Sequence, residues 1–172
     1  KDFGKDTVLP AYVVGDITKI LDFTPIGKVD CMIGGPPCQD FSITRGKKRS
    51  GINPASSIKE RVEVNRGRLY LEYVRAVKDT EPRFFAFENA PGLVSANDGL
   101  AYQTIVSDFE SHGYKILFSD IANATKVGVP QARRRLLILG ARDVATEKLA
   151  GIKDRARDIL TGEGSLVSRY PI

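Results

Sequence analysis

Cys38 stands in a setting that suits a nucleophile better than a core residue. It follows two prolines in the stretch Gly34-Gly35-Pro36-Pro37-Cys38-Gln39-Asp40, directly after an apolar run at residues 29–33. Proline fixes φ and lacks a backbone donor, so the pair excludes helix and strand and holds Cys38 in an extended turn. A lone cysteine is usually a small buried hydrophobe. The prolines and the polar residues that follow argue against that alternative, and we interpret Cys38 as a presented thiol.

Two further groups of charged residues lie at the ends of apolar runs. Glu88 directly follows residues 84–87. An acid in that position is unfavourable unless it is paired or used, although it could instead cap the next turn. Arg133 and Arg135 precede the apolar run at residues 136–139. Strand alternation would place both guanidinium groups on one side, whereas the alternative is an ordinary surface charge cluster.

The pattern of apolar residues predicts the elements that must position these side chains. Strands are expected at residues 29–33, 84–87, 115–122 and 136–139, and helices at residues 67–79, around 100–109 and at 152–160. Strands that alternate with helices are typical of an α/β fold with a mostly parallel sheet flanked by helices. The last two strands have no helix between them, which predicts an antiparallel pair at one edge. Ligands gather at the carboxyl ends of parallel strands, so Cys38 and Glu88 should meet there.

The composition excludes several classes of protein. The chain has 172 residues, 42% hydrophobic and 27% charged, which is typical of one soluble globular domain. No apolar run reaches the length of a membrane span, and the first residues lack a signal-peptide pattern. Two cysteines are too few for a disulfide framework, and Cys31 and Cys38 flank a strand and its turn, which suggests no bridge. These features predict a reducing, intracellular compartment.

Positive charge is concentrated beside the Cys38 turn. The chain carries a net charge of +5, and residues 45–68 hold eight basic and two acidic residues. Residues 45–65 combine glycines, serines and lysines without periodicity, which predicts a long mobile loop. A charge run is usually only a solvated loop. Beside a candidate nucleophile, however, it would lie where a polyanion such as nucleic acid must bind.

These motifs, taken together, resemble those of a known family. Pro36-Pro37-Cys38-Gln39, Glu88-Asn89-Ala90 and Gln131-Ala132-Arg133-Arg134-Arg135 look like the three signature motifs of the cytosine-C5 DNA methyltransferases, in family order. Asp16-Ile17 resembles the family's acidic cofactor turn, and Arg66-Gly67-Arg68-Leu69 resembles its helix-opening segment. The resemblance runs from about residue 12 to Asp143. It implies a Rossmann-like, S-adenosylmethionine-dependent methyltransferase fold.

The sequence departs from the family pattern in three places. Ala90 replaces the family's usual valine, a change expected to affect packing and not chemistry. The family's Phe-x-Gly-x-Gly motif is absent from these residues, as are the target-recognition domain and last motif that would follow Asp143. The resemblance therefore implies a fold incomplete at both ends, with residues 1–143 as a partial catalytic domain and 144–172 as the start of a linker or target-recognition region. The strand at residues 29–33 would then be an exposed edge, open to self-association.

The resemblance implies a DNA (cytosine-5-)-methyltransferase that moves a methyl group from S-adenosylmethionine to carbon 5 of a cytosine flipped out of double-stranded DNA. Cys38 would form a covalent bond to carbon 6 of the base, and Glu88 would hydrogen-bond its N3/N4 edge. Arg135 would hold the base's O2, with Arg133 supporting the site. The implied cofactor contacts are Asp16, Ile17, Pro37 and Leu69, and the implied DNA contacts are Gln39, Ser42, Arg45, Lys47 and Lys48. No metal ion is implied.

Three other functions remain open. A cysteine hydrolase would need His112, the one histidine, as its general base, but a histidine at the end of a helix is usually structural. An RNA cytosine-C5 methyltransferase would use the same chemistry on another nucleic acid. A catalytically silent relative would bind DNA without turnover. The leading interpretation implies DNA methylation in a restriction–modification system, a cytoplasmic, nucleoid-associated location if the source is prokaryotic, and no membrane partner; it leaves the oligomeric state open.

Overall fold

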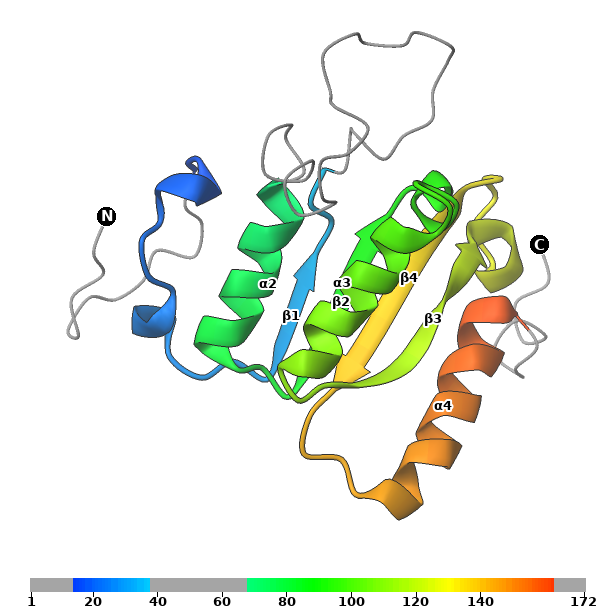
Figure 1. The fold of residues 1–172 in the computed structure, drawn as a ribbon. Coiled ribbons are helices and arrows are strands. Elements are labelled where there is room, and N and C mark those ends of the chain that lie inside the picture. Colours follow the sequence, from blue (N-terminus) through cyan, green and yellow to red (C-terminus); the bar gives the residue numbers. More distant parts are fainter. Residues whose placement is uncertain (1–13, 38–67, 163–172) are drawn as a thin grey trace, which may run out of the picture.

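The computed structural model describes residues 14–37 and 68–162, which form one four-stranded sheet with helices packed on it (Figure 1). The strands are β1 (Cys31–Gly34), β2 (Phe84–Asn89), β3 (Lys115–Asn123) and β4 (Arg134–Ala141), in the spatial order β1-β2-β4-β3. The helices are α2 (Arg68–Thr80), α3 (Leu100–Ser111) and α4 (Thr146–Thr161). Single 3-10 turns occur at η1 (Ile17–Lys19), η2 (Thr24–Ile26), η4 (Pro91–Val94) and η5 (Ala124–Val127).

Three of the four described strands, β1, β2 and β3, run in the same direction, and β4 runs against them. β1 pairs with β2 in parallel, whereas β4 lies between β2 and β3 and is antiparallel to both. The α/β class and the predicted antiparallel pair of the last two strands are confirmed. The prediction of a mostly parallel sheet holds for the strand directions, since β4 alone among the described strands is reversed. The reversal follows from the short η5 connection between β3 and β4, because a short link joins antiparallel neighbours while a parallel pair needs a long crossover.

Two of the strands, β2 and β4, extend further than their apolar runs. β2 includes Glu88 and Asn89 as its last two residues, so Glu88 does not follow the strand as predicted but belongs to it. β4 begins at Arg134 and continues through Gly140, which the sequence suggested as a strand end. A side chain at Gly140 would collide with the Phe85 ring, so glycine is placed there by packing and not by a turn. Backbone pairing sets these strand boundaries, and polar residues pair through their backbone as apolar ones do, so the apolar runs alone underestimate the strands.

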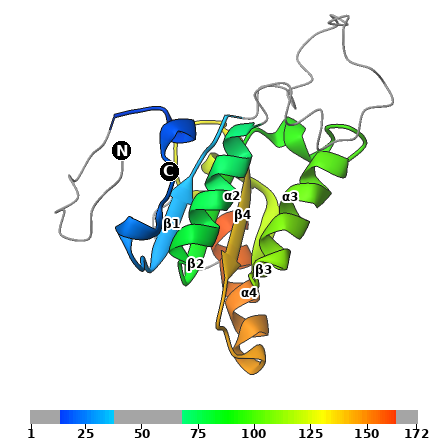
Figure 2. The ribbon, with the colours of Figure 1, turned by 60° about the vertical axis from the view of Figure 1, so that its left-hand side comes forward.

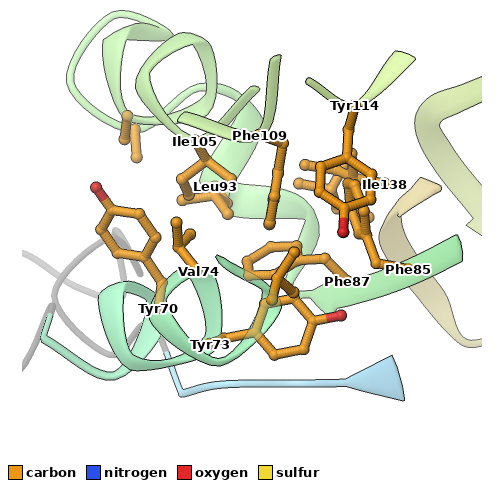
Figure 3. Close-up of a cluster of buried hydrophobic side chains, with 14 residues drawn as sticks. Tyr70, Tyr73, Val74, Phe85, Phe87, Leu93, Ile105, Phe109, Tyr114 and Ile138 are labelled. Carbon is orange, nitrogen blue, oxygen red and sulfur yellow. The ribbon is translucent and has the colours of Figure 1, made fainter. Parts of the chain in front are cut away.

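The hydrophobic core lies between the sheet and the two helices α2 and α3, which cover the same face of it (Figures 1 and 2). Figure 3 shows how side chains from α2, β2, α3 and β4 meet there. The rings of Phe85 and Phe109 stack with their centroids 4.1 Å apart, and Tyr73 packs against both Phe87 and Phe109. α4 packs instead against β3 and η5, at the other end of the sheet from β1. The core thus fixes β1, β2 and β4 relative to one another.

β1 is an edge strand of the described sheet, as the sequence predicted. Ile33 on this strand is 79% exposed, which is unusual for a large apolar side chain in a sheet. We expect the 172-residue chain, produced by itself, to self-associate as its concentration rises, because an unpaired apolar edge is a template for another strand. Ile33→Lys should shift it toward the monomer, since an edge lysine blocks such pairing. Sedimentation equilibrium would measure both, and a strictly monomeric, cooperatively folding wild-type chain would contradict the prediction.

The Tyr73 side chain of α2 connects β1 to β2 through hydrogen bonds to both strands. Its hydroxyl lies 3.1 Å from the Met32 carbonyl oxygen on β1 and 2.9 Å from that of Ala86 on β2. A side chain at Gly34 would overlap the Tyr73 ring, so the glycine lets β1 lie directly on it. Burial raises the pKa of Tyr73 above the ordinary range of tyrosine.

Tyr73→Phe is therefore expected to lower the free energy of unfolding by about 1–2 kcal/mol at neutral pH. Since the raised pKa favours the neutral phenol in the folded state, its contribution is complete below about pH 10 and is lost as the pH rises further. The variant should lose less stability than the wild type between about pH 9 and 11. Urea titrations at both pH values test this, and an identical alkaline loss in the two proteins would refute it.

Candidate active site

Two of the predicted catalytic residues, Glu88 and Arg135, lie at one edge of the sheet. β1 and β2 end there and β4 begins there, at the upper edge in Figure 1. Gly35, Pro36 and Pro37 continue from β1, and Glu88 and Asn89 close β2. Arg135 is the second residue of the antiparallel β4, which brings its side chain to the same edge. The sheet topology therefore brings together three segments, each about 50 positions from the next along the chain: the turn after β1, the end of β2 and the start of β4.

Glu88 and Arg135 form a direct ion pair. The Arg135 Nε donates to Glu88 Oε1 over 2.7 Å, and Arg135 Nη1 donates to its neighbour's carbonyl at Arg134, also 2.7 Å away. The two side chains are 39% and 33% exposed, so the pair is fixed in place yet open to a ligand. The alternative role for Glu88, as a cap of the next turn, is not seen: Ala90 occupies the cap position of η4, and the Glu88 carboxylate pairs with Arg135 instead.

The other carboxylate oxygen of Glu88 lies over the turn that leads to Cys38. A Cβ atom at Gly35 would stand 2.8 Å from Glu88 Oε2, closer than real Cβ atoms come to oxygen. Glycine at this position thus lets the carboxylate rest on the backbone of the turn. Within the described residues, Arg135 is the one donor to this carboxylate, and Oε2 is left to accept from a bound group. This arrangement combines an oriented acceptor with an adjacent cation.

Asn89 ties the two halves of the site together, a role that the sequence reasoning missed. Its side chain is buried although polar, with 6% of the residue exposed. Asn89 Nδ2 donates to the Pro36 carbonyl over 3.0 Å, while its Oδ1 accepts from the Ala90 N–H over 2.9 Å. The end of β2 therefore holds the proline turn by a specific hydrogen bond. Strand alternation could have found it, because Asn89 shares the core face with Phe85 and Phe87.

Arg133 lies one residue before β4. It precedes β4 rather than sharing the strand with Arg135, so alternation does not align the two guanidinium groups. Its backbone is held by the η5 turn, where the Ala124 N–H donates to the Arg133 carbonyl over 2.9 Å. The residue is exposed, and its guanidinium forms no hydrogen bond or ion pair with residues 14–37 or 68–162. Any role for Arg133 in the site therefore stays a prediction.

Three of the four predicted cofactor residues belong to η1 and α2, and the fourth, Pro37, follows β1. η1, which begins at Ile17, packs beside the first turns of α2, where Leu69 is the second residue (Figures 1 and 2). Ile17 and Leu69 are half-buried, and Pro37 is exposed just after β1. Asp16 caps η1 and is exposed beside it. Asp16, Ile17 and Leu69 therefore lie on two neighbouring elements, η1 and α2.

The Asp16 carboxylate accepts hydrogen bonds through one of its two oxygens among the described contacts. The Thr18 hydroxyl and the Thr18 N–H both donate to Asp16 Oδ1, over 2.7 and 3.0 Å. These two hydrogen bonds lower the pKa of Asp16, the hydroxyl having the larger effect. Among the described contacts, Oδ2 accepts no hydrogen bond. A charged acceptor beside apolar walls fits the amine or hydroxyl donors and the flat ring of a nucleoside.

Several predicted residues lie outside the described ranges, so the structure does not place them. They are Cys38, Gln39, Ser42, Arg45, Lys47 and Lys48, together with the predicted loop at residues 45–65. His112, the base required by a cysteine hydrolase, caps the end of α3 with its Nδ1 2.6 Å from the Asp108 carbonyl oxygen. That position precedes β3, at the sheet edge opposite Glu88, which opposes the hydrolase alternative. No helix within residues 14–37 and 68–162 combines the length and apolar character needed to cross a membrane.

Known proteins share both the sequence and the fold. A family model described as C-5 cytosine-specific DNA methylase matches residues 7–164. The chain is 42% identical, over 186 aligned positions, to the DNA (cytosine-5-)-methyltransferase M.ApeKI of Aeropyrum pernix, covering 91% of this chain and 37% of that protein. It is 40% identical to the type II methyltransferase M.NgoFVII of Neisseria gonorrhoeae, covering 76% of this chain and 32% of that protein.

A solved structure agrees with the family match. The crystal structure of a DNA modification methyltransferase encoded within an Escherichia coli prophage superposes with a TM-score of 0.52 and 25% identity, covering 77% of this chain and 35% of that one. The chain thus spans about a third of the length of the proteins it matches. The matched range includes Cys38 in the sequence, together with the Glu88 and Arg135 pair described above. The chain belongs to the C-5 cytosine-specific DNA methylase family.

Proposed function

We propose that the protein containing this chain transfers a methyl group from S-adenosylmethionine to carbon 5 of cytosine in double-stranded DNA. The observation that carries the proposal is the Glu88–Arg135 pair, which lies over the Gly35 backbone three residues before Cys38. An acceptor, a cation and a thiol at one strand edge suit addition to a polar heterocycle. The family membership and the relatives' names support the same reaction. In a prokaryote such an enzyme would work in the cytoplasm, at the nucleoid.

The Cys38 thiolate is the proposed nucleophile. Its sulfur bonds to carbon 6 of cytosine, and the electron pair of the 5,6 double bond moves to carbon 5, which then becomes nucleophilic. After methylation, loss of the carbon 5 proton restores the double bond and expels the thiolate. The ring edge must be reached from outside the duplex, so the cytosine is flipped out of the stack. The Asn89–Pro36 hydrogen bond holds the backbone that delivers Cys38.

Glu88 and Arg135 stabilise the base while the sulfur adds. Negative charge develops on the N3 and O2 side of the ring during that step. Glu88 is proposed to bind at the N3/N4 edge, where its free oxygen accepts from the N4 amino group, and Arg135 is proposed to donate to O2 and stabilise the charge there. The ion pair fixes both groups before the base arrives, so little reorganisation is needed. Arg133, exposed at the start of the same segment, is proposed to support the site from its rim.

The residues of η1 and α2 are proposed to hold the adenosine end of S-adenosylmethionine, which supplies an electrophilic methyl group when bound. Asp16 accepts from donors of the nucleoside through its spare oxygen. Ile17, Leu69 and Pro37 would cover the ring faces. Their half-buried or exposed state is suited to contact with a ligand. The chemistry of this set fits the cofactor, since it joins one carboxylate acceptor with apolar surfaces.

The basic segment that follows Cys38 is proposed to bind DNA phosphates, with Gln39, Ser42, Arg45, Lys47 and Lys48 nearest the flipped base. Neutralising Lys47, Lys48 and Arg49 together should weaken binding to all DNA sequences equally. The slope of log K against log salt should fall by as much as about 2.7, because each lost phosphate contact removes about 0.9. Fluorescence anisotropy at several salt concentrations measures the slope.

A matched control removes three positive charges elsewhere, by changing Lys153, Arg155 and Arg157 on the exposed side of α4 to glutamine. This control should keep the wild-type slope. An unchanged slope in the Lys47, Lys48 and Arg49 variant would make the segment an ordinary solvated loop. An equal decrease in both variants would show that net charge, and not a local contact, sets the binding.

The proposed function is tested by incubating the complete protein with tritiated S-adenosylmethionine and either double-stranded DNA, single-stranded DNA or structured RNA. We expect label in 5-methylcytosine of double-stranded DNA. Label in RNA alone would establish the RNA methyltransferase alternative. DNA binding without any transfer would establish the catalytically silent one.

A further inference from the structure

The segment that carries the candidate cofactor turn is attached to the rest of the molecule at few points. Residues 14–26 form the two turns η1 and η2 beside α2, outside the sheet (Figure 1). Phe23 is the one residue of this segment that is buried, with 5% exposed. The segment has no strand pairing of its own within the described residues. Its position must therefore be set by side-chain contacts from its neighbour α2.

Arg75 of α2 supplies most of these contacts. Its Nη2 donates to the Ile20 carbonyl over 2.7 Å, and its Nη1 donates to the Leu21 carbonyl over 3.4 Å. Its guanidinium lies 4.6 Å from the centre of the Phe23 ring. One side chain thus contacts three successive parts of the segment. A planar cation with several donors suits this task, and the single ammonium of lysine could not reproduce it.

Two acids of the same helix fix Arg75 in place. Glu72 Oε2 accepts from Arg75 Nε over 2.8 Å and from Nη2 over 2.5 Å. Asp79 Oδ2 lies 3.7 Å from Arg75 Nη1 and also accepts from the Phe23 N–H over 3.4 Å. The spacing of these acids, three residues before and four after Arg75, places them on one face of the helix. These acids therefore hold the Arg75 guanidinium in one orientation on α2.

Ile20, whose carbonyl accepts from Arg75, ends the η1 turn that Asp16 begins. Ile20 is the C-cap of η1, and its N–H donates to the Ile17 carbonyl over 3.2 Å. Asp16 closes the other end through Thr18, and its carbonyl accepts from the Lys19 N–H over 3.0 Å. Hydrogen bonds thus join residues 16–20 into one turn. Leu69, the opposite wall of the candidate cofactor site, belongs to the same helix as Arg75.

We infer that Arg75 is a positioning residue for S-adenosylmethionine, an inference that rests on the proposed function. By holding Ile20 and Leu21, it fixes Asp16 and Ile17 at a set distance from Leu69. It contacts no reacting atom. Its loss lets the Asp16 turn move away from α2 while leaving the Glu88 site intact. The consequence is weaker binding of the adenosine end, at an unchanged rate once the site is saturated.

The test measures binding of S-adenosylmethionine and of free adenosine to the complete protein by calorimetry. Arg75→Ala should weaken both by the same factor, about tenfold or more, because the turn contacts the adenosine part alone. The affinities of Arg75→Lys for both ligands should lie between those of the wild type and Arg75→Ala, since lysine keeps a cation beside Glu72 but loses one carbonyl contact. In methylation assays the KM for S-adenosylmethionine should rise and kcat should not. Arg83→Ala is the control: Arg83 also lies over a ring, that of Phe84 at 5.8 Å, but at the opposite edge of the sheet.

A double-mutant cycle separates positioning from general stability. In an Asp16→Ala background, Arg75→Ala should cause a smaller further weakening than in the wild type, because Ile17 is then the one group of the two that it still positions. Equal weakening in both backgrounds, or wild-type affinity in Arg75→Ala, would overturn the inference while leaving the proposed function standing. If the wild type binds neither S-adenosylmethionine nor adenosine, the proposed function fails, and the inference fails with it. Should Arg75→Ala not fold, the Arg75→Lys measurements decide by the same criteria.

Discussion

Glu88→Gln is expected to slow methyl transfer by about 100- to 1,000-fold in the complete protein, the usual effect of removing one oriented group that stabilises developing charge. Glutamine has nearly the same shape and still reaches Gly35, so the fold should be kept. It no longer carries the charge that holds Arg135 at 2.7 Å. Both the orientation of the cation and the acceptor for the N3/N4 edge are weakened together. The loss should appear in kcat rather than in the affinity for DNA.

Single-turnover assays with labelled S-adenosylmethionine would measure this rate, and a filter-binding assay would measure the affinity for DNA. Glu110→Gln is the matched control, since Glu110 is exposed on α3 and lies outside the site. It should methylate like the wild type. A kcat for Glu88→Gln within about threefold of the control would remove Glu88 from the proposed mechanism.

Cys38→Ser is expected to have a larger effect, lowering methyl transfer by about 10⁴- to 10⁶-fold, the range seen when a nucleophile is removed from an enzyme that depends on it. A serine hydroxyl is hardly ionised at neutral pH and does not add to carbon 6. DNA binding should remain, because the phosphate contacts do not involve the thiol. Cys31 provides the control: it is an exposed, free cysteine on β1, and Cys31→Ser should retain full activity. Activity lost in Cys31→Ser and kept in Cys38→Ser would reverse the assignment.

The sequence was most informative where residue chemistry and strand ends coincide. Cys38, Glu88 and Arg135 can be chosen from the residue pattern alone, since a thiol after two prolines and charges beside apolar runs are unusual. The fold brings Glu88 and Arg135 together at 2.7 Å, as that choice requires. Arg133 was harder, because its place relative to β4 depends on where strand pairing begins. The alternation of side chains between the two faces of a strand predicts which way a residue points only when the residue at which the strand begins is known.

Other features could not be read from the chain because they depend on tertiary contacts. The antiparallel entry of β4 between β2 and β3 is a property of the whole sheet. Asn89 and Gly35 act through partners 53 residues away, the Pro36 carbonyl and the Glu88 carboxylate respectively. Arg75 reaches Ile20 from 55 residues along the chain. No local pattern marks such pairs.

The most direct test of the account is covalent trapping of the complete protein on double-stranded DNA that carries 5-fluorocytosine, in the presence of S-adenosylmethionine. Fluorine on carbon 5 cannot leave as a proton does, so the thiolate cannot be expelled and the adduct should persist. We expect the wild type and Cys31→Ser to form a DNA adduct stable to denaturing electrophoresis, and mass spectrometry to place the bond on Cys38. Cys38→Ser should form none. An adduct of undiminished yield in Cys38→Ser, or one attached to another residue, would contradict the central claim.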